Sequence, residues 1–403
     1  MMERSFKSLD SIKCRKIQAD TFYLRRTPLV YVGLFLTMIK TLCGRSNYIP
    51  YPDQMDNLVS ACILFTFIFA IFLKKYSIKN LFLYGIVGLL ALYTAKITGI
   101  MLLPVTVLII LAIRNEPMDF VAKFMYFWKI RFFIIHSIFA FLLAPTGLSR
   151  IGGIYERNRR YRMNFGFNYA GQFTDYVMDL MILWIICNYD KLNKTSFIKL
   201  FIVAIFTYLC SDSKTGLGVS CILIVLVWLS KRTTKMDRII RNFDQFSIPV
   251  LTGLLFYTIN SFALGKSWAY YIDDLLTTRI RLNGYLYSIY GTTWFGQVIE
   301  SYSGEYSEIW QSIGSTFDCV YSWLIIEVGA VWLILIALSF YILAKRRDRL
   351  LNCFLAVWIL GALTDTDYLY GTCNCTILML SLVFSTGKTI YEDRNPLISS
   401  VIR

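Results

Sequence analysis

The chain has 403 residues, of which 56% are hydrophobic and only 17% are charged, and its formal net charge at pH 7 is +15. Soluble domains usually carry about 25% charged residues, so this composition excludes an ordinary soluble fold. Repeated uncharged runs of roughly 15–20 residues predict an all-α, polytopic integral membrane protein. The positive charges stand in short loops beside these runs, which favours a role in membrane orientation and argues against nucleic acid as a partner.

Twelve apolar runs predict about twelve transmembrane helices. Several runs are shorter than the roughly 20 residues that a straight span needs, so some helices must include flanking residues. The predicted spans are 28–43, 57–73, 79–95, 97–113, 131–147, 172–188, 197–211, 216–230, 247–264, 319–344, 351–365 and 373–388.

The distribution of Lys and Arg predicts that both termini lie in the cytoplasm. The basic N-terminal segment lacks an apolar region followed by a small-residue cleavage site, which predicts a retained tail rather than a signal peptide. With this end inside, the inner segments hold 29 of the 41 Lys and Arg residues, as the positive-inside rule requires. The predicted organisation is a tail (1–27), five helices (28–148), a basic outer loop (149–171), four helices (172–264), a large outer loop (265–318), three helices (319–388) and a tail (389–403).

The first outer loop concentrates arginine on the side where membrane proteins have no topological need for it. Five arginines lie within the thirteen residues from Arg150 to Arg162. Guanidinium groups are planar and permanently charged, which suits phosphate or carboxylate. Binding to anionic lipid headgroups, or simple solvation, stays open as the alternative.

The large outer loop carries Arg279 and Arg281 on a predicted amphipathic helix over residues 272–286. Such a helix would lie at the membrane surface or cap the bundle. The two arginines either bind an anion or are solvated charges on its polar face. The loop's many Trp and Tyr side chains can stack on sugars, but an interfacial aromatic belt is the favoured interpretation.

A short polar turn, Ser213-Lys214-Thr215-Gly216, comes at a predicted outer helix start. Free N–H groups and the helix dipole make such a start a ready anion site. An ordinary Ser N-cap beside an incidental Lys is the alternative.

Carboxylates near and within the predicted spans are the candidate acid–base groups. Asp318 opens the tenth helix, either as a stabilising helix-start residue or as a general base. Asp175, Asp179 and Glu327 lie inside predicted spans, where charge is costly and usually functional. Asp175 and Asp179 share a helix face that we expect to look into the bundle. His136, the sole histidine, is predicted to be a packed core residue.

The sequence contains no Walker A motif, Rossmann fingerprint, HExxH or GxSxG pattern in a suitable context. Its ten cysteines give no disulfide framework or zinc pattern. We therefore predict no cofactor and no metal, and any chemistry must use a substrate that is already activated.

The layout resembles the bacterial O-antigen polymerase family (Wzy-type), which is related to the O-antigen ligases. The resemblance covers about residues 150–344. Arg162 followed by Gly166-Phe167 is similar to one family element, but Asn168-Tyr169-Ala170 stands where a Pro-Asn pair often follows. The large loop lacks the histidine that the ligases use as a base. The other matching elements are Ser213-Lys214-Thr215-Gly216 (with Lys for the usual Arg), Thr278-Arg279-Ile280, and Asp318 with Tyr321 and Gly329.

This resemblance implies a polymerase/ligase architecture of the GT-C-like kind in the bacterial inner membrane, with the active site facing the periplasm. It implies metal-independent transfer of a growing glycan from undecaprenyl diphosphate to the next lipid-linked repeat unit, in lipopolysaccharide or other polysaccharide biosynthesis. A chain-length regulator is an implied partner. The implied diphosphate ligands are Arg162, Arg279, Arg281 and Lys214, the implied catalytic residues are Asp318 and Arg279, and the implied substrate contacts are Asp175, Glu300 and Tyr321.

Two other functions stay open. An O-antigen ligase differs only in the acceptor. A lipid-linked oligosaccharide flippase or an ion-coupled transporter would instead depend on charges inside the bundle, such as Asp175, Asp179 and Glu327, and a flippase should have short outer loops.

Overall fold

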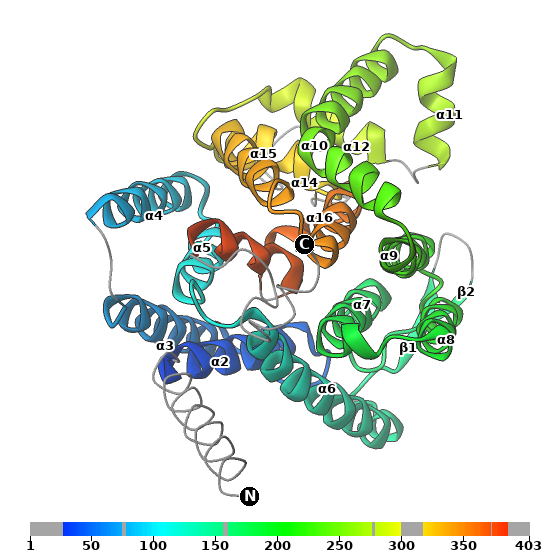
Figure 1. Ribbon diagram of the computed structural model, residues 1–403. Coiled ribbons are helices and arrows are strands. Elements are labelled where there is room, and N and C mark those ends of the chain that lie inside the picture. The colour runs from blue at the N-terminus through cyan, green and yellow to red at the C-terminus, as the bar shows by residue number, and fades with distance from the viewer. Residues whose placement is uncertain are drawn as a thin grey trace, which may run out of the picture.

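The computed structural model describes residues 27–74, 78–155, 160–275, 279–299, 317–371 and 373–385. They form a helical bundle (Figure 1). Eight helices are long and apolar enough to cross a membrane, which supports the predicted all-α membrane class; the number of twelve spans stays a prediction. These eight are α2 (Pro28–Arg45), α3 (Asp53–Phe72), α4 (Ile78–Thr98), α6 (Met118–Leu143), α7 (Ala170–Asn188), α8 (Lys194–Ser211), α9 (Lys214–Arg232) and α10 (Thr234–Ala263).

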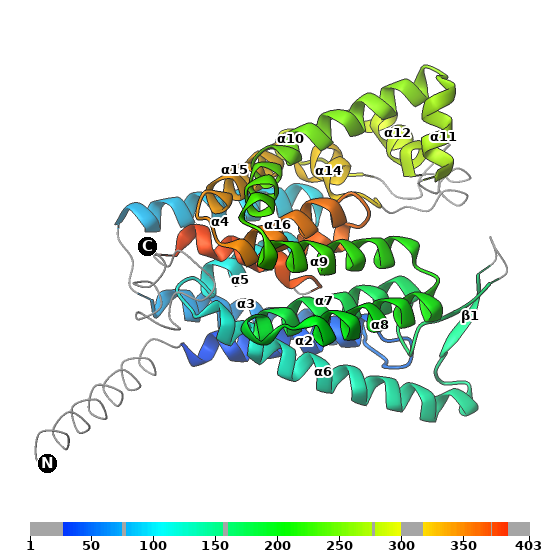
Figure 2. The same cartoon turned by 45° about the vertical axis from the view of Figure 1, so that its right-hand side comes forward.

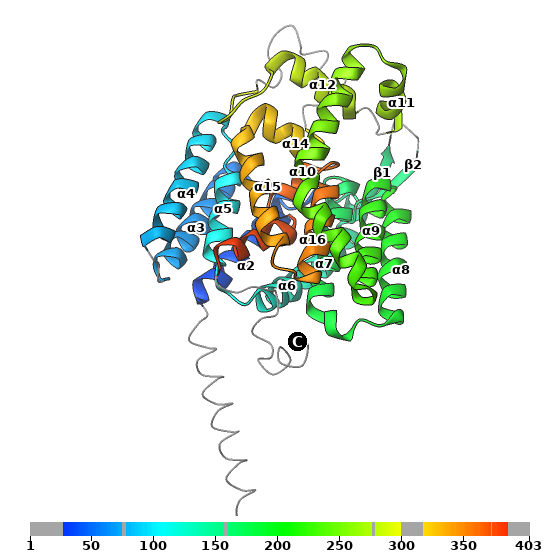
Figure 3. The same cartoon turned by 45° about the horizontal axis from the view of Figure 1, so that its top comes forward.

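Short apolar helices fill the middle of the bundle. They are α5 (Leu102–Ala112), α16 (Arg349–Gly361) and η6 (Cys375–Phe384), and the longer helices surround them in two views (Figures 1 and 3). Helices of this length reach roughly 16–20 Å, less than the roughly 30 Å hydrocarbon core. The predicted spans 97–113, 351–365 and 373–388 are therefore shorter helices than expected. α16 and η6 are joined through the short helix η5 (Thr366–Leu369), and almost every residue of both is buried.

An ion pair in the core joins α6, α7 and η6. α6 begins at Met118, not near the predicted 131, so Lys129 lies within the helix rather than in a cytoplasmic loop. Lys129 Nζ donates a hydrogen bond to Asp179 Oδ2 of α7, and both side chains are at most 2% exposed. The N–H of Cys375, at the start of η6, donates to Asp179 Oδ1. This carboxylate therefore accepts from a lysine and from a helix start at once.

A two-stranded hairpin marks one end of the bundle (Figure 2), which we call the hairpin end. After α6 and the short helix η1 (Ala144–Thr146), strands β1 (Gly152–Tyr155) and β2 (Arg160–Met163) pair antiparallel, with Gly153 opposite Arg162. The all-α prediction missed these strands. The segment that follows is fixed to α2, because the N–H of Asn168 donates to the carbonyl of Arg45. His136 lies in α6 and is buried. Its Nε2 lies 3.1 Å from Ser46 Oγ, which agrees with a core histidine.

The predicted helix over residues 272–286 is wrong as a single helix. The chain forms α11 (Ser267–Leu275) and α12 (Arg279–Tyr290). The N–H of Arg281 donates to Asp273 Oδ1 at 2.8 Å, whereas residues eight apart in one straight helix are separated by about 12 Å. α11 and α12 are therefore two separate helices, and Asp273 fixes the start of α12.

The predicted span 319–344 is interrupted. α14 (Val320–Trp323) runs into a π-helical turn, η4 (Leu324–Val328), and α15 (Ala330–Ala344) begins after Gly329. Gly329 has φ +122°, and a Cβ there would lie 2.6 Å from the carbonyl oxygen of Trp294. The N–H groups of Thr293 and Gln297 donate to the carbonyls of Ile325 and Glu327. The preceding loop thus satisfies the backbone groups that the break exposes.

The Lys129–Asp179 pair gives a stability prediction. Replacing Lys129 with Ala should lower the free energy of unfolding by about 3–5 kcal/mol, because an uncompensated buried carboxylate is left behind. Thermal unfolding of the detergent-solubilised protein measures the change. Lys123→Ala on the same helix is the matched control: Lys123 pairs with Asp119 but is half exposed, so we expect a loss within about 1 kcal/mol. Equal losses for both variants would contradict the prediction.

Candidate functional site

Three groups of charged side chains, which come from six elements and the adjoining loops, lie at the hairpin end of the bundle. We call them the charged row. It consists of a basic side (Arg160, Arg162, Asp212 and Lys214), an acidic centre (Asp175, Asp365 and Asp367 with Arg45) and a far side (Asp318 and Arg279).

The acidic centre contains three carboxylates and one guanidinium. The closest oxygens of Asp175, Asp365 and Asp367 all lie within 4.8 Å of one another. Arg45, the last residue of α2, donates from Nη2 to Asp367 Oδ2 at 2.5 Å and to Cys373 Sγ at 2.7 Å. Three negative charges against one positive charge are unfavourable in a partly buried site, so we expect this group to retain a proton.

Asp365 and the neighbouring Asp175 are the two carboxyls that can share that proton. Asp365 lies in the connection between α16 and η5. Burial, followed by the charge of Asp367, raises the pKa of Asp365 to about 6. A carboxyl that titrates near neutral pH suits general acid–base chemistry. Three carboxylates at this spacing are also a donor set for a divalent cation, but Arg45 already neutralises one of them and we assign no metal.

Asp175 is tied to the basic side through the residue before it. Thr174 donates from Oγ1 to the carbonyl of Ala170 and lies 2.8 Å from Ser211 Oγ at the end of α8. A Cβ on Gly216 would lie 2.1 Å from Thr174 Cγ2, so glycine is needed where α9 meets α7. The acidic centre therefore lies beside the first turn of α9.

In the first turn of α9, Ser213 is the N-cap that the sequence offered as one interpretation, and the Lys214 side chain is exposed. Ser213 Oγ accepts from the N–H of Gly216 at 3.3 Å, as an N-cap side chain should. Lys214 is the first residue of α9 and is exposed. The turn can therefore present a cation and a helix start to an anion.

Arg160 and Arg162 both contact Asp212. They are two residues apart on β2 and so point to the same face of the strand. Arg160 Nη1 lies 3.2 Å from Asp212 Oδ1, and Arg162 Nη2 lies 3.3 Å from Oδ2. Asp212 follows α8 in the left-handed region, with φ +52°. This geometry turns its carboxylate towards the hairpin.

Arg279 and Asp318 meet on the far side of the row. Arg279 Nε lies 3.6 Å from Asp318 Oδ2, with the side chains 19% and 43% exposed. Burial raises the pKa of Asp318, and the charge of Arg279 opposes that rise. The negative charge of Asp318 in turn contributes to the raised pKa of Asp365. The predicted catalytic pair is therefore coupled electrostatically to the acidic centre.

Other predicted residues lie elsewhere. Arg281 Nε lies 3.4 Å from Asp273 Oδ2, away from Asp318. Tyr321 is fully buried and its hydroxyl donates to the carbonyl of Ile359. Glu300 lies outside the described residues.

Asp179 faces Lys129 and not Asp175, although the two aspartates share a helix. Glu327 accepts from Trp323 Nε1.

The sequence reasoning missed Arg45, Asp365 and Asp367. The available signal was a pair of aspartates, Asp365-Thr366-Asp367, in a short predicted outer connection. Arg45 lies at the outer end of the first predicted helix, outside the two outer loops in which the sequence analysis looked for cations. Neither segment carries enough charge for the sequence alone to predict a site there.

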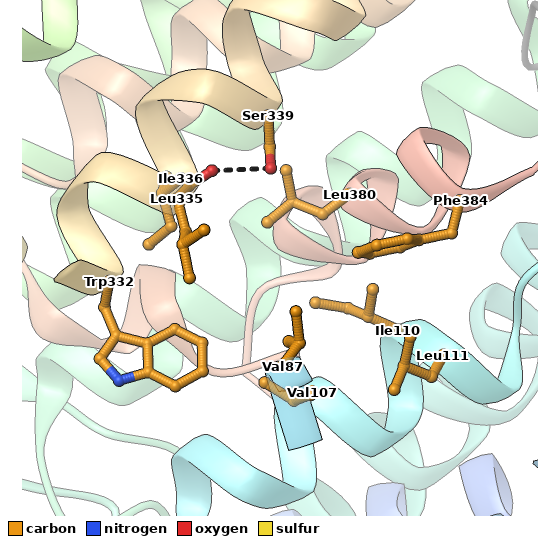
Figure 4. Close-up of a pocket in the computed structure, with 10 residues that line it drawn as sticks. All are labelled: Val87, Val107, Ile110, Leu111, Trp332, Leu335, Ile336, Ser339, Leu380 and Phe384. Atoms are coloured by element: carbon orange, nitrogen blue, oxygen red, sulfur yellow. Dashed lines mark hydrogen bonds between the residues drawn. The ribbon is translucent and has the colours of Figure 1, made fainter. Parts of the chain in front are cut away.

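A small pocket lies away from the row, between α4, α5, α15 and η6 (Figure 4). Its volume is about 90 Å³. Trp332, Val107 and Phe384 line it, and the hydroxyl of Ser339 is turned to the carbonyl of Leu335. An apolar lining of this kind favours hydrocarbon and would not hold a diphosphate.

Comparison with family models, with curated proteins and with solved structures finds no match to this chain. The geometry of the row is therefore the basis for assigning a function.

The raised pKa of Asp365 predicts a pH-dependent stability. Its folded pKa of about 6 exceeds the usual unfolded value of about 3.9. The free energy of unfolding should therefore fall as pH rises from about 4 to 6 and then level off. Asp365→Asn keeps an oxygen for the N–H of Asp367 and removes the titration.

We expect Asp365→Asn to be more stable than the wild type at pH 8, on the order of 1–3 kcal/mol, and similar to it at pH 4. Thermal unfolding at both pH values measures this difference. Asp274→Asn, at an exposed site on α11, should leave the wild-type pH profile unchanged. A variant that is less stable than the wild type at pH 8 would contradict the raised pKa.

Proposed function

We propose that this protein is a surface-polysaccharide polymerase of the O-antigen type. In this role it transfers a growing glycan from undecaprenyl diphosphate to the next lipid-linked repeat unit, at the periplasmic face of the bacterial inner membrane. The observation that supports this most is the charged row. It brings cations and titratable carboxylates together at one end of an apolar bundle, where the headgroup of a lipid-linked substrate would lie.

The reaction needs two kinds of charge in one place. An acceptor sugar hydroxyl attacks the anomeric carbon of the donor glycan, a new C–O bond forms, and the bond to the diphosphate oxygen breaks. The electron pair leaves with the diphosphate, and the hydroxyl proton passes to a carboxylate. Cations must stabilise the leaving diphosphate while a base accepts the proton. No external energy source is needed, because the donor is already activated.

The row supplies both parts. We assign the diphosphate to Arg279, with Arg162 and Lys214 as the further cations of the row. Arg281 lies two residues after Arg279 on α12 and pairs with Asp273 outside the row, and we propose it as an additional ligand. Asp318 is the proton acceptor, since it lies beside Arg279. Asp175 and Asp365 belong to the acidic centre, and in this proposal the acceptor sugar approaches that centre.

The competing functions differ in which residues matter. A transporter would use the carboxylates of the spans, but Asp179 is neutralised by Lys129 in the core, and Glu327 accepts from Trp323. Asp175 belongs to the row instead. A ligase would use the same row with another acceptor, so the product must distinguish ligase from polymerase.

A gel of the cell's lipopolysaccharide or other surface glycan, with this gene deleted, tests the proposal. A ladder that collapses to core plus one repeat unit would support a polymerase, because repeat units are still made, exported and attached. Core without any repeat would point to a ligase or flippase. An unchanged ladder would contradict the proposal.

Arg279→Ala should abolish chain elongation in the deletion strain, because the leaving diphosphate loses its nearest guanidinium. Arg279→Lys keeps the charge but loses the planar fork, so a weak ladder of short chains is expected. Arg232→Ala is the matched control. Arg232 lies over the Trp228 ring at the opposite end of α9, so its replacement should leave the ladder intact. Normal ladders from Arg279→Ala at wild-type expression would remove Arg279 from the site.

A further inference from the structure

The arginines of the hairpin end are held by carboxylates of the same chain. Arg279 faces Asp318, Arg281 faces Asp273, and Arg160 and Arg162 share Asp212. Each pair joins two segments of the chain: Arg279 and Arg281 lie on α12, Arg160 and Arg162 lie on β2, and their carboxylate partners lie outside these two elements. In this structure, the cations assigned to a diphosphate are therefore already neutralised, apart from the exposed Lys214.

These pairs have the geometry of exchangeable contacts. Their N–O separations are 3.2–3.6 Å, longer than the 2.7–2.9 Å of a strong charge-assisted hydrogen bond. Asp318 is 43% exposed, so its pair with Arg279 contributes little free energy. Asp212 and Asp273 are at most 11% exposed, so the pairs that they make cost more to separate. A diphosphate carries more negative charge than one carboxylate and has more acceptor oxygens, so it can replace the aspartate.

We propose that Asp318 is an internal competitor of the donor diphosphate: it neutralises Arg279 until the diphosphate binds and is thereby released to act as the base. This inference rests on the proposed function and adds an order of steps to it. The donor must bind before the acceptor hydroxyl can be deprotonated, because the carboxylate that takes the proton is engaged until then.

The exchange also makes Asp318 a stronger base. Before binding, the charge of Arg279 opposes the rise in the pKa of Asp318 that burial causes. Once Arg279 turns to the diphosphate, this opposition is lost and the carboxylate becomes a stronger proton acceptor. The stronger base and the bound leaving group therefore appear together.

The proposal predicts that removing the Asp318 carboxylate has opposite effects on diphosphate binding and on polymerisation. Asp318→Asn removes the competing charge, so the diphosphate should bind more tightly, about two- to fivefold. The same change removes the base, so polymerisation should be lost. A residue that only maintained the fold would weaken both properties together. Asp318→Glu keeps the carboxylate and should retain wild-type binding with a partial ladder.

Farnesyl diphosphate in detergent solution is a suitable probe, because it carries the diphosphate and a prenyl chain but no sugar to transfer. Its affinity would be measured for the wild type, Asp318→Asn and Asp318→Glu, each first shown to unfold at the wild-type temperature. Asp119→Asn, which breaks the Lys123 pair on α6, is the matched control and should leave the affinity unchanged. The same variants would be tested for the glycan ladder in cells.

Tighter binding by Asp318→Asn together with a lost ladder is the expected result. Equal or weaker binding by Asp318→Asn, with a wild type that binds the probe, would overturn the competition while leaving the proposed function in place. A normal ladder from Asp318→Asn would overturn Asp318 as the base. No binding by the wild type, with an unchanged ladder on gene deletion, would overturn the proposed function and this inference with it.

Discussion

The carboxylate of Asp179 makes the arrangement of the bundle core possible. A helix that begins in the interior of an apolar bundle exposes N–H groups that no water can satisfy. η6 begins in this way, and Asp179 accepts the N–H of Cys375 while Lys129 neutralises the charge. Because η6 starts there, the chain between α16 and η6 stays within the bundle. Asp365 and Asp367 lie on that connection, so the acidic centre depends on this buried pair.

The same kind of ion pair has two different roles, and burial decides between them. Lys129 and Asp179 are at most 2% exposed, and their separation would leave an uncompensated charge in low dielectric. Arg279 and Asp318 are 19% and 43% exposed, so water can compensate the Asp318 carboxylate when they part. The first pair is therefore a fixed part of the scaffold. The second can exchange partners at little cost, which is what a site for an anionic substrate requires.

Hydropathy located the long helices but misplaced the starts of two of them, and it predicted the short central helices poorly. α6 and α10 begin 13 residues before the predicted 131 and 247. α2 and α7 begin within two residues of the predicted 28 and 172. α16 and η6 are equally apolar but face protein and not lipid, a difference that composition cannot reveal. The extension of α6 to Met118 was missed because Lys129 looked like a loop residue, and only its contact with Asp179 explains it. In the site, Asp318, Arg279 and Asp175 were predicted from cost and position. Arg45 was not, because its partner Asp367 is 322 residues away in sequence.

The acidic centre also explains why the row can work without moving the scaffold. Asp175 is fixed through Thr174 against the start of α9, and Asp367 is fixed by Arg45 at the end of α2. Asp365 lies between them and responds to the charge of Asp318. A change of partner at Arg279 would therefore alter the electrostatic potential at Asp365. No helix would need to move for this to happen. Under the proposed function, proton uptake at the centre and anion binding at the arginines are linked by electrostatics alone, across side chains whose backbones stay in place.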